Sequence, residues 1–169
     1  MVRIGLLASV CSGLLILTAC RQQDGDYQDS VRQTDIDRAI LAGELSTGDW
    51  IENSNDNEEV VMFGLNQTEP KLSFHCNLIT KQIFLEKDEY IPDQNKVKVK
   101  FITPTGSKNY QATVENHGFP ALYLTFEPND PFLDEIAAAE NRFAVVPEVG
   151  KQLLVPGSPK INELFTRCS

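Results

Sequence analysis

The chain has 169 residues, and its 24 acidic side chains outnumber its 15 basic ones, so the formal net charge at pH 7 is −9. An acidic surface repels phosphate groups, which argues against nucleic-acid binding and against attachment to anionic lipid headgroups through the charge of the protein. With 41% hydrophobic residues, the chain has enough apolar side chains for one domain with a core.

The first nineteen residues have the layout of a signal peptide. A single cation, Arg3, precedes an apolar run over residues 4–19, which is shorter than the roughly 20 residues of a transmembrane helix. The run ends in Leu17-Thr18-Ala19-Cys20, where small residues precede a cysteine. We therefore expect residues 1–19 to be removed.

This ending resembles the lipobox of bacterial lipoproteins. The resemblance implies a diacylglyceryl group on the Cys20 sulfur, cleavage before Cys20 and acylation of the new amine by a fatty acid such as palmitate. Two or more acyl chains hold a protein stably to a membrane. Arg21 stands where the inner-membrane retention signal of enteric bacteria has Asp, so the resemblance favours the periplasmic face of the outer membrane. An ordinary secretory cleavage is the alternative, but it gives no reason for a cysteine at the cut.

Removal of residues 1–19 leaves 150 residues and takes away one cation and no acid, which brings the formal charge to −10. Cys11 leaves with the signal, so Cys76 and Cys168 remain besides Cys20. A lone pair of thiols in an oxidising compartment usually forms a disulfide, and neither cysteine has the Cys-x-x-Cys spacing of a redox-active pair. We expect a structural Cys76–Cys168 disulfide.

Residues 20–46 are expected to form the lipidated tether. From Arg21 to about Thr34 the sequence is polar with little to bury, which predicts a disordered segment. Thr34-Asp35 is a cap signal for a short helix over residues 36–41, and we expect that helix to lie on the surface of the domain.

Residues 47–169 are predicted to form a single β-rich periplasmic domain. Short segments with period-two alternation follow Trp50 and are separated by polar or glycine- and proline-containing turns. The expected strands are a hairpin from Trp50 to residue 63, residues 72–77, 83–85, 96–101, 110–114 and 122–126, and a last hairpin over residues 143–155. This pattern predicts a mainly β fold, an antiparallel barrel or sandwich of about seven to nine short strands.

Two short helices are expected near the C-terminus. Asp130-Pro131 and Ser158-Pro159 each place a capping residue before a proline, which the first helical turn tolerates. Cys168 falls on the apolar face of the second helix, and Cys76 falls on the apolar face of strand 72–77. Both sulfurs are therefore expected to point into the core.

Neither histidine lies in a catalytic or metal-binding pattern. His75 neighbours Cys76, but strand alternation sends the two side chains to opposite faces, which excludes a Cys–His nucleophile pair. His117 lies in a turn, and a zinc site from both histidines and a carboxylate lacks ligand spacing. Residues 53–59 lack the glycine and terminal glutamate of an EF-hand loop, so we interpret them as a solvated hairpin tip. We expect no metal, no cofactor and no catalytic residue.

Two acidic pairs, Asp88/Glu89 and Asp134/Glu135, remain as candidates for acid–base chemistry. The second pair lies where acids favour the N-terminal half of a helix, which is a structural explanation. Asn66-Gln67-Thr68 is formally a glycosylation sequon, which has no meaning in a bacterial envelope protein.

The second half of the chain resembles small envelope lipoproteins of proteobacteria. The matching pieces are Asp130-Pro131-Phe132-Leu133-Asp134, Arg142-Phe143-Ala144-Val145, Leu154-Val155-Pro156, and Ile161 ahead of Cys168. These are packing and capping residues, so the resemblance implies a fold and no mechanism.

The resulting expectation is a membrane-anchored envelope lipoprotein that acts as a non-enzymatic binding or envelope-maintenance module. Its partners would be the membrane, through the lipid, and a periplasmic or cell-wall protein that is basic. The combination of lipobox, compact β domain and disulfide resembles lipid-anchored lysozyme inhibitors, which makes an inhibitor of a cationic cell-wall hydrolase the alternative. Their Ser-Gly-x-x-Tyr segment has a poor counterpart in Thr105-Gly106-Ser107 and Tyr110. A hydrolytic enzyme is a third, weaker hypothesis.

Overall fold

The computed structural model describes residues 23–89, 91, 95–116, 120–138 and 142–169. The expected signal peptide and Cys20 lie outside these residues. The chain divides into two units, residues 1–35 and 36–169, and everything below concerns the second unit except the start of the first helix. Within the described residues, no helix combines the length and the apolar character needed to cross a membrane.

The described chain contains nine strands and three helices. Their bounds are α1 Gln23–Leu41, β1 Asp49–Ser54, β2 Glu58–Gly64, β3 Pro70–Asn77, β4 Gln82–Asp88, β5 Lys96–Ile102, β6 Ser107–Asn116, β7 Pro120–Thr125, α2 Pro131–Ala137, β8 Arg142–Pro147, β9 Leu153–Pro156 and α3 Pro159–Cys168.

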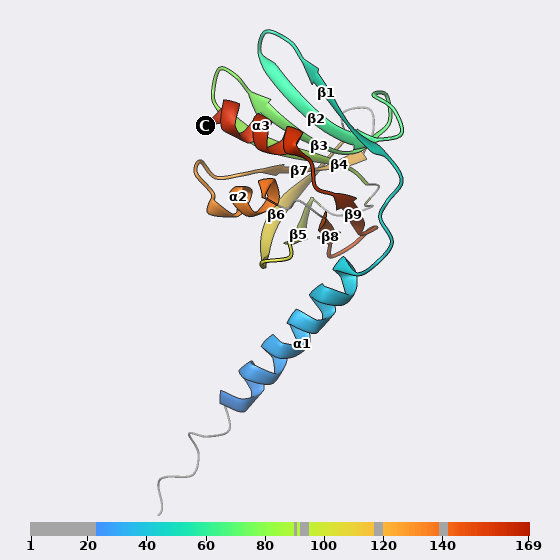
Figure 1. Ribbon diagram of the computed structural model, residues 1–169, viewed down its shortest axis with the longest axis vertical. Coiled ribbons are helices and arrows are strands. Elements are labelled where there is room, and N and C mark those ends of the chain that lie inside the picture. Colours follow the sequence, from blue (N-terminus) through green and yellow to red (C-terminus); the bar gives the residue numbers. More distant parts are fainter. Residues whose placement is uncertain (1–22, 90, 92–94, 117–119, 139–141) are drawn as a thin grey trace, which may run out of the picture. The chain divides into compact units, whose positions relative to one another are not determined.

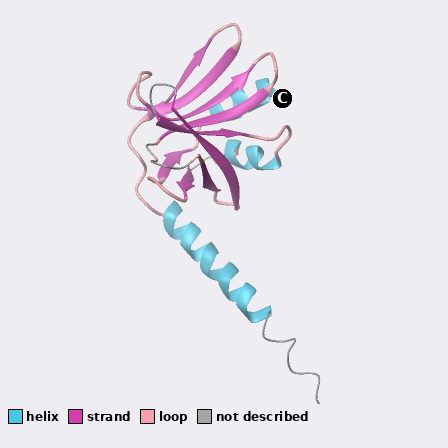
Figure 2. Ribbon diagram, turned by 180° about the vertical axis from the view of Figure 1, so that it is seen from behind, coloured by secondary structure: helices cyan, strands magenta, loops and turns pink. Residues whose placement is uncertain are grey.

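The strands form one antiparallel sheet in the order β1-β2-β3-β4-β7-β6-β5-β8-β9. The sheet curls into a half-barrel, and α3 lies against its concave face on β2, β3 and β4 (Figures 1 and 2). The prediction of a mainly β antiparallel fold with two helices near the C-terminus is confirmed. Of the two predicted architectures, the structure is nearer the barrel, because all nine described strands belong to one curled sheet.

The concave face holds the core. Its largest fully buried side chains are aromatic, and they come from strands along the whole sheet: Phe63, Phe74, Phe101, Phe126 and Phe143. Trp50 on β1 stacks near Phe143 on β8, with ring centroids 6.2 Å apart, and its Nε1 donates to the carbonyl of Pro156 at 2.8 Å. The two ends of the curled sheet thus approach each other over the core. Each buried phenylalanine contributes about 1.5–3 kcal/mol through removal of apolar surface from water.

A disulfide joins the middle of the chain to its C-terminal helix. Cys76 on β3 and Cys168 on α3 have sulfurs 2.09 Å apart, and both side chains are buried. The apolar faces that alternation and helical spacing assign to β3 and α3 meet here: Leu72 and Phe74 line the strand, and Phe165 packs edge-on to Phe74 at 5.3 Å.

Residues 23–34, for which composition predicts disorder, are helical instead, and the expected cap at Thr34-Asp35 lies inside α1. The physical reason lies at the other end of this helix. Ile40 and Leu41 pack on the convex side of the sheet, against Ile102, Ala144 and Leu154. Once that last turn is held in place, the unfavourable nucleation of the helix is already complete. Each further residue then joins the helix by propagation, which adds one backbone hydrogen bond per residue. The expectation that residues 36–41 end on the domain surface is confirmed for these two residues.

One lysine of β5 departs from its expected solvated position. The valines of β5 and Phe101 are buried as alternation predicts, and Lys96 and Lys98 are exposed. Lys100, however, is half-buried, and its Nζ lies 2.6 Å from both carboxylate oxygens of Asp37 on α1. The alternation of β5 correctly places Lys100 on the face opposite the core. It gives no information that the end of α1 covers this part of that face.

Both predicted caps are present. The carboxylate of Asp130 accepts from the Phe132 N–H at 3.0 Å at the start of α2, and the Ser158 hydroxyl accepts from the Lys160 N–H at 3.3 Å at the start of α3. The helix that Asp130 caps, α2, ends at Ala137.

We predict that Cys168→Ser lowers the free energy of unfolding by about 2–4 kcal/mol, because the bridge closes a long loop in the unfolded chain. The α3 helix should loosen first, and Cys76 should become reactive to thiol reagents. Urea denaturation with and without reductant measures the loss, and reductant should destabilise the native protein but not the variant. Complete alkylation of both cysteines in freshly isolated, unreduced protein would contradict the bridge.

Candidate functional site

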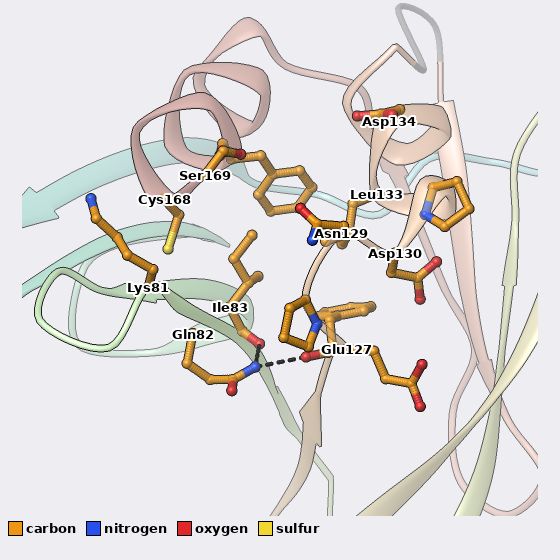
Figure 3. A pocket seen from close by; sticks show the side chains of 14 residues that line it. Lys81, Gln82, Ile83, Glu127, Asn129, Asp130, Leu133, Asp134, Cys168 and Ser169 are labelled. Atoms are coloured by element: carbon orange, nitrogen blue, oxygen red, sulfur yellow. Dashed lines mark hydrogen bonds between the residues drawn. The ribbon is translucent and has the colours of Figure 1, made fainter.

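A pocket of about 330 Å³ opens between the β3–β4 turn, the β7–α2 connection and the C-terminal end of α3 (Figure 3). Its floor is apolar and includes Ile83, Phe126, Leu133, Phe165 and the bridged Cys168. Polar side chains form its rim: Lys81, Gln82, Glu127, Asn129, Asp134 and Ser169. The pocket therefore combines apolar surface with hydrogen-bonding groups at the edge, as small recognition sites do.

Hydrogen bonds fix the β3–β4 turn that forms one wall. The side-chain oxygen of Asn77 accepts from the N–H groups of Ile79 and Thr80, at 3.0 and 2.9 Å. Lys81 follows with φ of 57°, in the left-handed region. Its Nζ donates at 2.8 Å to the carbonyl of Arg167, in the last turn of α3, where a cation also suits the helix dipole. The wall is thus tied to the same helix end that the disulfide holds.

Asp130 forms the base of the opposite wall. Besides capping α2, its carboxylate accepts from Lys108 Nζ at 2.7 Å and from the Tyr110 hydroxyl at 2.9 Å. Burial raises the pKa of this carboxyl, but the hydrogen bonds from Lys108, from the Phe132 N–H and from Tyr110 outweigh it, so the pKa lies below its ordinary 3.8. Burial, followed by the hydrogen bond and charge of Asp130, raises the pKa of Tyr110. This network holds α2 against β6.

The acidic pairs singled out in the sequence are separated in the structure. Asp134 is exposed on the pocket rim, whereas Glu135 accepts from the hydroxyls of Thr103 and Thr105 at 3.2 and 2.9 Å and so anchors the β5–β6 turn. The two carboxylates therefore point to different places, Glu135 to the β5–β6 turn and Asp134 to solvent. They are not arranged as an acid–base pair on either side of a bound substrate.

In the other acidic pair, Asp88/Glu89, one carboxylate belongs to a buried ion pair. Asp88 is exposed, but Glu89 Oε2 lies 2.5 Å from Lys87 Nζ and accepts from the Lys151 N–H at 2.8 Å. The Lys87 side chain is only 4% exposed. Sequence reasoning assigned it no role, although the alternation that places Ile83 and Leu85 in the core extends to position 87. A buried lysine needs such a partner to offset the loss of hydration.

His75 lies on the convex face, opposite Cys76, as alternation predicts. Its Nδ1 is 2.9 Å from Glu58 Oε1, its Nε2 is 3.8 Å from Glu86 Oε2, and its ring stacks on Phe84 at 4.5 Å. His117 lies outside the described residues, so the two-histidine zinc arrangement cannot be placed. In the part of the chain that the structure describes, no three His, Cys, Asp or Glu side chains are grouped to hold a metal.

The polar run before β2 is a hairpin tip. Asn55 Oδ1 accepts from the N–H groups of Asn57 and Glu58, at 2.9 and 3.0 Å, so this oxygen closes the turn. In the same way, Asn66 Oδ1 accepts from the Thr68 and Glu69 N–H groups in the β2–β3 loop. Both are Asx turns, a common function of asparagine in loops.

Comparison with protein-family models, curated proteins and solved structures finds no match. The chemistry of the site therefore stands on the geometry of the chain itself. That geometry offers an apolar floor, a polar rim and walls held by a disulfide and by Asp130, which together suit reversible contact with a partner group.

We predict that Asp130→Asn destabilises the domain by about 1 kcal/mol at pH 7, through a weaker cap and loss of the charged hydrogen bonds. Because the pKa of Asp130 is lowered on folding, its contribution is present above about pH 4 and is lost as the pH falls toward the folded-state pKa. Urea denaturation at pH 7 and pH 3 should therefore show a smaller difference between native and variant at pH 3. Asp134→Asn, on the same helix but exposed, is the control; an equal loss in both variants would contradict the assignment.

Proposed function

We propose that this protein is an exported, lipid-anchored component of the bacterial envelope, held at the periplasmic face of the outer membrane, and that its β domain is a non-enzymatic binding module. The observation that carries the proposal is that the three cysteines of the mature chain fall into two chemical classes. Cys20 ends the lipobox, whereas Cys76 and Cys168 are buried and bonded to each other. Lipidation and a core disulfide both belong to proteins that leave the cytoplasm.

The binding part of the proposal is supported by how the ionisable groups near the pocket are used. Asp130 and Glu135 accept hydrogen bonds from a helix N–H, a lysine, a tyrosine and two threonines, which are contacts that hold the fold. Beside the pocket, Ile79 at the tip of the β3–β4 turn is 74% exposed. A single exposed apolar side chain is ordinary on a protein surface, so the binding proposal rests on the pocket, whose apolar floor and polar rim are the form that recognition sites take.

We predict that Cys20→Ser abolishes incorporation of labelled palmitate in a bacterial host and leaves uncut precursor, because the sulfur that receives the diacylglyceryl group is gone. Cys11→Ser, which changes a cysteine inside the signal peptide, is the matched control and should be labelled and processed normally. The measurement is fluorography of the immunoprecipitated protein with its mass. Normal processing of the Cys20→Ser variant, or no label on the native protein, would contradict the anchor.

The alternative inhibitor hypothesis is supported by the acidic charge of the chain and by its resemblance to lipid-anchored lysozyme inhibitors. If the partner is a cationic hydrolase, the purified mature protein should bind it at low salt and lose it as the ionic strength rises past about 0.15 M, where the Debye length is near 8 Å. Absence of binding at low salt would remove this version and would leave the anchored binding module in place.

A further inference from the structure

The convex face of β2, β3, β4, β7 and β6 gathers carboxylates around aromatic rings, and we name it the acidic face. Figure 2 shows these strands from the side opposite α3. The face consists of six side chains from neighbouring strands: Glu58, His75, Phe84, Glu86, Tyr123 and Glu115.

Strand register makes these residues a continuous surface. His75 is paired across the ladder with Phe84, and Glu86 is paired with Tyr123. Thr113 is the partner of Tyr123 on β6, and Glu115 follows two residues later on the same face. Directly opposite residues in a sheet have Cβ atoms about 4.5–5.5 Å apart, so the rings and carboxylates are neighbours.

Besides burial, the carboxylates of this face contribute to a raised pKa of Tyr123. Burial, then the charge and hydrogen bonding of Glu86 and the charge of Glu115, raise the pKa of Tyr123 to about 12. Two of its carboxylates are reachable from solvent, since the side chains of Glu58 and Glu86 are 34% and 38% exposed. The rings beside them are partly buried, and those of Phe84 and His75 stack with 11° between their planes.

Among the described residues, the lysines near this face are fewer than its carboxylates. Lys71 on β3 donates its Nζ to the Thr47 carbonyl at 2.8 Å, and Lys96 and Lys98 lie one strand beyond, on β5. Asp88 adds a further exposed carboxylate on β4. The summed charge of these described side chains is therefore negative.

We propose that the acidic face is a docking surface for a basic protein segment, whose arginine side chains pair with Glu86 and Glu115 and lie against the rings of Phe84 and Tyr123. We choose a basic occupant because its positive charges would complement the carboxylates of the acidic face. A guanidinium group is planar and weakly hydrated, so it stacks on aromatic rings and pairs with carboxylates at the same time, which an ammonium group does less well. This inference rests on the proposed binding function and names the chemical class of its partner.

The test uses the full mature chain and a tetra-arginine peptide as the probe, with tetra-lysine for comparison. Binding is followed at low salt by NMR, through the ring resonances of Phe84 and Tyr123. We expect Glu86→Gln and Glu115→Gln each to weaken tetra-arginine binding by about two- to fivefold, which lies within the effect of losing one exposed ion pair. Tetra-arginine should bind more tightly than tetra-lysine.

The matched controls remove the same charge elsewhere. Glu148→Gln, in the exposed β8–β9 turn, and Glu163→Gln, exposed on α3, should leave the affinity within about 1.5-fold. Unchanged thermal midpoints show that each variant is folded. Equal weakening by all four variants, ring shifts confined to the pocket, equal affinity for the two peptides, or no binding at low salt would overturn the docking surface. Palmitate labelling at Cys20 is independent of these results, so the docking surface can fail while the anchor stands.

Discussion

A curled sheet presents an apolar concave face that is unstable in water, and the rest of this fold depends on covering it with α3. The helix supplies Ile161, Leu164 and Phe165 to the core, and its last residue, Cys168, is bonded to Cys76 on β3. The bridge and the packing support each other, because the sulfurs meet only when the helix is seated and the helix stays seated while they are bonded. The pocket is a product of the same docking, since the end of α3 forms one of its sides and receives Lys81 from the β3–β4 turn.

Most of this architecture can be predicted from the sequence because its signals are local. Period-two alternation around Phe74 and Val99 identifies strands and their buried faces, and Asp130-Pro131 and Ser158-Pro159 identify helix starts. The pairing of β4 with β7 is not local: the chain leaves the sheet after Asp88, and β5 returns three positions along it. No turn motif specifies where such a strand will dock, so alternation predicts the elements but not their order.

The parts that sequence reasoning missed are polar groups whose contacts form only in the folded sheet. Lys87 pairs with Glu89, two residues away, but Glu89 is held in place by the N–H of Lys151, 62 residues further along the chain. Asp130 acts as a cap whose further partners, Lys108 and Tyr110, lie on another strand. A capping signal reveals one of the three hydrogen bonds that the Asp130 carboxylate accepts, whereas the other two depend on tertiary docking. The candidate pocket is missed for the same reason: its walls come from three connections that only the folded sheet brings together.

The attachment of α1 has a mechanical consequence. Its final turn is held by Asp37 on Lys100 and by Ile40 and Leu41 on the convex cluster, and the Arg142 guanidinium donates to the carbonyls of Leu41 and Gly43 at 3.0 and 3.2 Å. A pull on the chain from its N-terminal side therefore meets these contacts before it reaches Trp50 on the edge strand. The force therefore reaches β5, β8 and β9, which make these contacts, before it reaches the hydrogen bonds that pair β1 with β2.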